Sequence, residues 1–220
     1  FQAGVKIATL MMLFIQMFRY ASEPFFFSRA GKEKSKEDYA TIMEHFTAFS
    51  ILVFLGITLF IDVVALILGK DFREGMDIVP VMLMAYVILG MNFNVSMWYK
   101  LSGKTRYAIY ITAAGLPVTL AANMFFMPLF SYHAAAWGHL VSYLIMLALS
   151  VWMGNRHYTI PYNWKRISIF IVSGVILYAL SLLVKDAGVI QKYLVHILLI
   201  LIYIFIYLKT EKISIWKLKF

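Results

Sequence analysis

The sequence contains no cysteine and has few charged residues for its length. Without thiolates, no cysteine-ligated metal site can form. Only 14% of the residues are charged, against about 25% in an average soluble domain. The apolar share is 62% of 220 residues, which is more than a compact soluble domain of this size can bury. These shortages exclude an ordinary soluble domain and predict a membrane protein.

The sequence also lacks the motifs of common catalytic centres. It has no phosphate-binding P-loop, no His-Glu-x-x-His zinc motif and no nucleophile elbow of the Gly-x-Ser-x-Gly type. Nothing in the pattern therefore predicts an enzyme, a cofactor or a metal centre. The residues that can indicate a function are the polar ones within the apolar runs.

Seven runs are long enough to cross a bilayer core, which needs roughly 20 apolar residues in a helix. They are predicted at residues 2–22, 46–69, 78–99, 107–127, 132–153, 167–184 and 191–208. The connections between them are short, and none is large enough to fold alone. The predicted fold is all-α, a polytopic transmembrane helix bundle of about seven spans.

The positive charge is distributed unevenly over the two predicted sides. Fifteen of the 20 Lys and Arg residues flank one side and four flank the other, while Lys6 lies within a helix. Cytoplasmic loops collect Lys and Arg, so the C-terminus is predicted to be cytoplasmic and Phe1 to face outward. This bias explains the net charge of +9 without a nucleic-acid partner.

One face of the first predicted helix is polar. At 100° per residue, the shared arc contains Thr9, Gln16, Arg19, Tyr20 and Glu23, with Lys6 beside it. Lipid does not solvate such a face, which therefore needs a polar cavity or partner. Arg19 either pairs with Glu23 at i, i+4, reaches to the cytoplasmic interface or contacts a substrate. Pro24 favours a kink or a helix end just after it.

Polar residues also align along later helices. Asn92 and Tyr99 share a face with Lys100 beside them, and Asn123 and His139 lie on the next two helices. Residues in such positions more often hold helices together than bind ligands, and His139 is also a candidate proton carrier. The candidate substrate-binding residues are Lys6, Gln16, Arg19, Glu23, Asn92, Tyr99, Lys100, Asn123 and His139.

Two acidic residues of the second predicted helix lie far apart. Glu44 and Asp62 are separated by eighteen residues, a rise of about 27 Å. They cannot contact each other and are predicted to mark the two membrane interfaces.

Three stretches resemble bacterial polysaccharide flippases of the Wzx type, which transport O-antigen units. AGVKIATLMMLFIQMFRYASEPFF resembles their C-lobe helix in which a lysine precedes an aromatic-rich end and a proline. FREGMDIVPVMLMAYVILGMNFNVSMWYKLSGKT resembles the segment that passes from an outer turn through a polar helix to a basic loop. AANMFFMPLFSYHAAAWGHLVSYLIM resembles the hairpin that follows.

This resemblance implies membership of the multidrug/oligosaccharidyl-lipid/polysaccharide exporter superfamily, whose members have two pseudo-symmetric lobes. Residues 1–154 would form C-lobe helices and residues 155–220 two additional C-terminal helices. The chain would then be the C-terminal half of a two-lobed flippase in the bacterial inner membrane. Its partners would be the lipid bilayer, a lipid-diphosphate-linked oligosaccharide and the missing N-terminal lobe of the same polypeptide.

Other functions remain open on the sequence alone. A lipid II flippase of the same superfamily fits the same pattern. An ion-coupled drug antiporter would need a carboxylate-rich cavity, and Lys6 and Arg19 on the polar face argue against one. A membrane glycosyltransferase or polymerase usually has a large outer loop with catalytic residues, whereas no predicted outer loop exceeds about ten residues.

Overall fold

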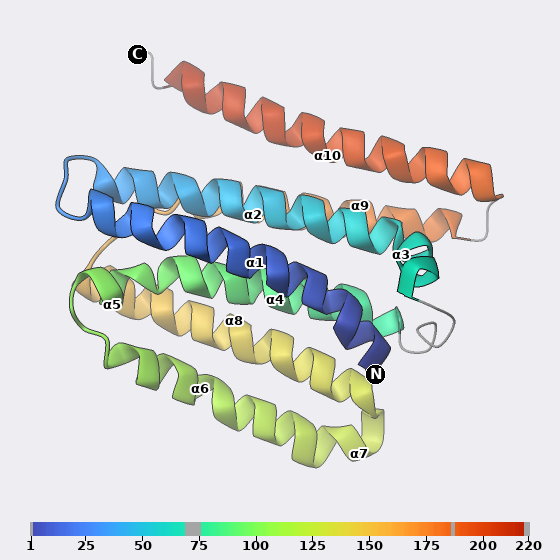
Figure 1. Ribbon diagram of the computed structural model, residues 1–220, viewed down its shortest axis with the longest axis horizontal. Helices are drawn as coiled ribbons and strands as arrows, with labels where there is room; N and C mark the ends of the chain where they lie inside the picture. The colour runs from blue at the N-terminus through green and yellow to red at the C-terminus, as the bar shows by residue number, and fades with distance from the viewer. Residues whose placement is uncertain (1, 69–75, 186–187, 218–220) are drawn as a thin grey trace. The chain divides into compact units, whose positions relative to one another are not determined.

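The computed structural model describes residues 2–68, 76–185 and 188–217, and every regular element within these ranges is helical (Figure 1). The helices are α1 (Gln2–Arg29), α2 (Ser35–Leu59), α3 (Ile61–Leu68), η2 (Met76–Ile78), α4 (Val79–Val95), α5 (Met97–Leu101), α6 (Tyr107–Ala121), η3 (Ala122–Phe126), α7 (Met127–Phe130), α8 (Tyr132–His157), α9 (Trp164–Ser181), η4 (Leu182–Val184) and α10 (Val189–Lys217). The all-α prediction is confirmed for this part of the chain.

Six helical segments in the described ranges are long and apolar enough to cross a membrane. They are Ser35–Leu59, Met76–Leu101, Tyr107–Phe130, Tyr132–His157, Trp164–Val184 and Val189–Glu211. The seventh predicted span is the helix α1, which does not belong to this set. Lys6, Gln16, Arg19 and Glu23 make α1 more polar than the other six. The chain is thus a helical protein with the composition of a multi-pass membrane protein.

Proline and serine positions shape individual helices. Pro24 lies inside α1, which continues to Arg29, so the helix does not end at this proline and the predicted alternative of a kink stays a prediction. Pro80 lies in the first turn of α4, where its missing N–H costs no helical hydrogen bond. Ser96 separates α4 from α5 and donates its hydroxyl to the Phe93 carbonyl oxygen at 2.6 Å. The backbone at Ser96 keeps helical dihedral angles, φ −57° and ψ −17°, so α5 continues α4 after a local irregularity.

The contacts divide the chain into two compact units. The first contains Phe1–Met43 and Asp71–Tyr162, and the second contains Glu44–Lys70 and Asn163–Phe220. The boundary lies within α2, whose later part is grouped with α9 and α10. The predicted division after residue 154 rests on the resemblance rather than on contacts, and it stays a prediction.

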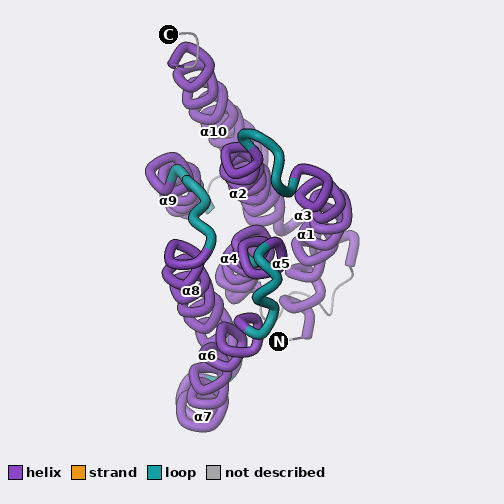
Figure 2. The backbone as a smooth tube through the Cα atoms, turned by 90° about the vertical axis from the view of Figure 1, so that its left-hand side faces the viewer, coloured by secondary structure: helices purple, strands orange, loops and turns teal. Residues whose placement is uncertain are grey.

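In the first unit, α4 lies between α1 and α8, and α6 packs on α8 (Figure 2). Side chains of α1 such as Ile7, Met11 and Ile15 are buried, as are Leu83 and Met91 of α4. Since α4 is covered on two sides, most of its residues are buried. This arrangement brings the polar face of α1 next to the end of α4 and the short helix α5.

In the second unit, α9 and α10 hold the later part of α2 through close backbone approach and buried polar contacts. Gly174 of α9 has no room for a side chain, because a Cβ atom there would lie 2.3 Å from Ile51 Cγ2. Tyr203 of α10 is buried and donates its hydroxyl to the Ala48 carbonyl oxygen at 3.0 Å. At one end of this unit, Lys192 Nζ lies 2.5 Å from Asp62 Oδ2.

Candidate functional site

Arg19 and Glu23 form the local pair that their i, i+4 spacing predicts. Arg19 Nε lies 3.5 Å from Glu23 Oε1 on the same face of α1. The Arg19 guanidinium carbon also lies 5.0 Å from the centroid of the Phe93 ring of α4, in the geometry of a cation–π contact. Arg19 Nε is buried and has no hydrogen-bond partner within the part of the chain that the structure describes. Among the described residues, the contact of this nitrogen is therefore the ion pair with Glu23, and it is shielded from solvent.

Lys100 of α5 contacts the same carboxylate oxygen. Its Nζ donates a short hydrogen bond to Glu23 Oε1, so one carboxylate is shared by two cations from different helices. The formal charge of this triad, defined as Arg19, Glu23 and Lys100, is +1. Their side chains are 35%, 28% and 27% exposed. This exposure leaves the triad open to a ligand while screening by water is reduced.

An aromatic cluster fixes the orientation of α5 and thereby of Lys100. Trp98 is buried and donates its indole N–H to Ser150 Oγ of α8 at 3.2 Å. Its ring stacks on His157 with centroids 5.6 Å apart. Gly154 makes room for this ring, because a Cβ atom there would lie 3.0 Å from Trp98 Cδ1. The sequence analysis did not identify this cluster, although Ser150 and Gly154 form a small-residue pair at i, i+4.

Tyr99 and Gln16 belong to the surroundings of the triad. Tyr99 lies within electrostatic range of Arg19 and Glu23 and packs edge-on against Trp98. Gln16 is partly buried one helical turn before Arg19. Five of the predicted site residues thus lie in one region of the first unit, namely Gln16, Arg19, Glu23, Tyr99 and Lys100.

Asn92 has a packing contact that accounts for its position. Its amide group donates to the Ile88 carbonyl oxygen at 3.2 Å and to the Tyr143 carbonyl oxygen of α8 at 2.9 Å. These bonds connect α4 to α8, as expected of a polar residue that holds helices together. Its Oδ1 atom is buried without a partner in the described residues, which leaves one acceptor for a water or ligand group.

The other three predicted site residues lie elsewhere in the first unit. Lys6 is exposed on α1, thirteen residues or about 20 Å of helix before Arg19. Asn123 is exposed within the π-helical turn η3. His139 Nδ1 lies 2.7 Å from the Ala135 carbonyl oxygen of its own helix, and eighteen residues, about 27 Å, separate it from His157 at the end of α8. The structure does not bring these three to the triad.

No protein-family model matches the chain, and no curated protein or solved structure gives a significant match. The class that the helices define is that of a multi-pass membrane protein. Any more specific function depends on the chemistry of the triad.

Proposed function

We propose that the protein is a flippase of lipid-linked oligosaccharides in the bacterial cytoplasmic membrane. The observation that carries this proposal is the carboxylate of Glu23 shared by Arg19 and Lys100. A half-buried group of two cations and one anion is one negative charge short of neutrality. It therefore favours an anionic ligand over a cationic one.

The diphosphate of a lipid-linked sugar is suited to this group. Its oxygens accept charge-assisted hydrogen bonds, and a guanidinium donates two of them in parallel. In the resting state Glu23 balances the two cations, which lowers the cost of keeping them half-buried. When the substrate arrives, the diphosphate takes the place of the carboxylate between Arg19 and Lys100. The lipid chain stays in the bilayer throughout.

The predicted orientation places the triad at the cytoplasmic end of α1, on the side where such a substrate is loaded. With the C-terminus also cytoplasmic, transport to the outer leaflet requires a second lobe that rocks against this one. The missing N-terminal lobe of the same polypeptide is the proposed partner. The step moves a lipid and breaks no covalent bond, so no catalytic residue or cofactor is assigned.

The charge of the triad disfavours the antiporter alternative. A cavity for organic cations needs a carboxylate that is free to pair with the drug, whereas Glu23 is already paired with two cations. The substrate of a lipid II flippase carries the same diphosphate group and differs in its sugar. The site therefore supports a lipid-diphosphate substrate class rather than one particular oligosaccharide.

Transport can be measured directly in proteoliposomes that contain the full-length protein and a fluorescent lipid-diphosphate oligosaccharide. Dithionite reduces only the probe in the outer leaflet, and we expect the protein to raise the reducible fraction above that of protein-free liposomes. A fluorescent phosphatidylcholine is the matched control, because its head lacks the diphosphate and should not be moved. If the protein leaves the reducible fraction of the diphosphate probe unchanged, or moves both probes equally, the proposal is wrong.

A further inference from the structure

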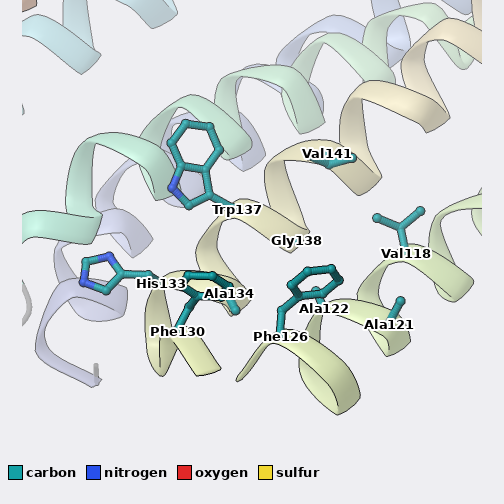
Figure 3. A pocket seen from close by; sticks show the side chains of 10 residues that line it. All are labelled: Val118, Ala121, Ala122, Phe126, Phe130, His133, Ala134, Trp137, Gly138 and Val141. Carbon is teal, nitrogen blue, oxygen red and sulfur yellow. The ribbon is translucent and has the colours of Figure 1, made fainter. Parts of the chain in front are cut away.

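A groove of about 660 Å³ runs along α8 in the first unit, away from the triad. One side is formed by α6, η3 and α7, and the other by the first half of α8 (Figure 3). Figure 3 shows Phe126 and Phe130 on one wall and Trp137 on the other, with His133 at one end. The volume lies within the range of about 300–1,000 Å³ that is typical of small-molecule sites.

Small residues and a π-helical turn create the groove. Along the groove, η3 and α8 approach so closely that a Cβ atom on Gly138 would lie 2.4 Å from Ala122 Cβ. The π-helical turn starts at Ala122, and its wider winding changes the direction of the following side chains. Phe126 and Phe130 stack with centroids 6.4 Å apart. The backbone of η3 and α8 thus positions the side chains that form the walls of the groove.

The end of the groove carries an imidazole and a carboxylate. His133 Nε2 lies 2.9 Å from Asp77 Oδ2, and Tyr132 donates its hydroxyl to the same oxygen at 3.5 Å. Asp77 Oδ1 accepts from the Ile78 backbone N–H at 3.1 Å, which fixes the carboxylate. The His133 and Asp77 side chains are 47% and 51% exposed. Both are therefore accessible to a polar head group beside the apolar groove.

We propose that this groove binds one acyl chain of a phospholipid whose head carries a protonated primary amine. The amine donates hydrogen bonds to Asp77 in the place that His133 Nε2 now occupies, and the Nε2–H of His133 then donates to the phosphate. Three observations favour this occupant. The walls belong to two of the apolar helices that are long enough to cross a membrane. The wall side chains Phe126, Phe130 and Trp137 are 52%, 59% and 55% exposed. The head-group end offers a carboxylate that can accept from an amine and an imidazole N–H that can donate to a phosphate.

Other lipid heads fit this end less well. A choline head has no N–H to donate to Asp77, and a glycerol head offers no cation. A diphosphate head brings several negative charges close to the Asp77 carboxylate, which opposes binding. The groove is therefore assigned to a bilayer lipid and not to the transported substrate, and the inference does not depend on the proposed function.

Native mass spectrometry of the full-length protein tests this inference with three lipids of identical acyl chains and ethanolamine, choline or glycerol heads. We expect one tightly retained ethanolamine lipid, with a preference over the choline lipid of at least about tenfold, or 1.4 kcal/mol. Asp77→Asn keeps an acceptor for the Ile78 N–H but removes the charge, and should equalise the three lipids. Ala121→Trp fills the groove and should reduce retention of all three.

Leu144→Trp is the matched control, because Leu144 is 44% exposed on α8 and does not line the groove. It should leave lipid retention unchanged, and circular dichroism shows whether each variant keeps its helices. Equal retention of the ethanolamine and choline lipids by the unmodified protein would overturn the assignment. So would identical behaviour of Ala121→Trp and Leu144→Trp. A dimer that dissociates in Ala121→Trp would assign the groove to a second copy of the chain instead.

Discussion

Arg19→Lys is expected to abolish flipping in the intact protein, and Arg19→Ala should do the same. A lysine keeps the charge but donates to the diphosphate from one nitrogen atom, whereas a guanidinium donates from two. One of the two parallel hydrogen bonds is therefore lost. A hydrogen bond to a charged group contributes about 1.5–3 kcal/mol. The expected loss is therefore roughly ten- to a hundredfold for this bond alone. The measurement is complementation of a flippase-null strain, read as surface polysaccharide, with membrane levels checked by immunoblot.

Two further variants separate this role from simple pairing. Glu23→Gln should be milder, because the carboxylate only occupies the site until the diphosphate replaces it. Arg29→Lys is the control for an arginine outside the triad. Arg29 Nε lies 3.6 Å from Asp38 Oδ2, and the Arg29 side chain is 45% exposed. It should complement fully. If Arg19→Lys also complements fully, the bidentate contact is wrong and Arg19 serves only as an interfacial or paired cation.

Arg166→Leu is expected to destabilise the second unit strongly. Arg166 Nη1 lies 2.7 Å from Glu44 Oε2, and its Nη2 donates to the Thr210 carbonyl oxygen at 3.1 Å. One side chain thus connects α9 with α2 and α10. The two charged side chains are 18% and 12% exposed, so the leucine leaves the Glu44 carboxylate buried and unpaired. Breaking such a pair lowers the free energy of unfolding by about 3–5 kcal/mol. The measurement is the midpoint of thermal unfolding in detergent, which should be lower for the variant.

The control is the substitution Lys165→Leu at the neighbouring position. Lys165 is exposed, and its replacement by leucine removes one positive charge, as Arg166→Leu does. Its midpoint should stay close to that of the unmodified protein. The double variant Glu44→Leu with Arg166→Leu should lose less stability than Arg166→Leu alone, because no unpaired charge remains. Equal midpoints for Arg166→Leu and Lys165→Leu would show that the pair does not hold the unit together.

The helical class and the contact within α1 could be predicted because both depend on local sequence. Apolar runs of about 20 residues define the helices, and i, i+4 spacing brings Arg19 to Glu23. The count of seven spans differs from the six apolar helices because α1 carries the polar face on which the site depends. Of the two outcomes predicted at Pro24, the helix end is excluded, because α1 continues for another five residues.

Contacts between distant segments could not be predicted. Lys100 was a candidate, but its pairing with Glu23 depends on the packing of α1 on α4 and on Trp98, which packs against Gly154. Glu44 and Asp62 were predicted only to mark interfaces, yet each pairs with a cation more than 120 residues away in the chain. The groove along α8 depends on a π-helical turn, for which the hydrophobic pattern gives no signal.

The central claim is that Arg19, Glu23 and Lys100 bind a lipid diphosphate, and ligand binding to the purified full-length protein tests it most directly. The probes are one isoprenyl chain carrying a diphosphate and the same chain ending in an alcohol, titrated in detergent by isothermal calorimetry. We expect the diphosphate to bind at least about tenfold more tightly, and Arg19→Ala and Lys100→Ala each to remove this preference. Equal affinities for the two probes, or a preference that survives in both variants, would contradict the account.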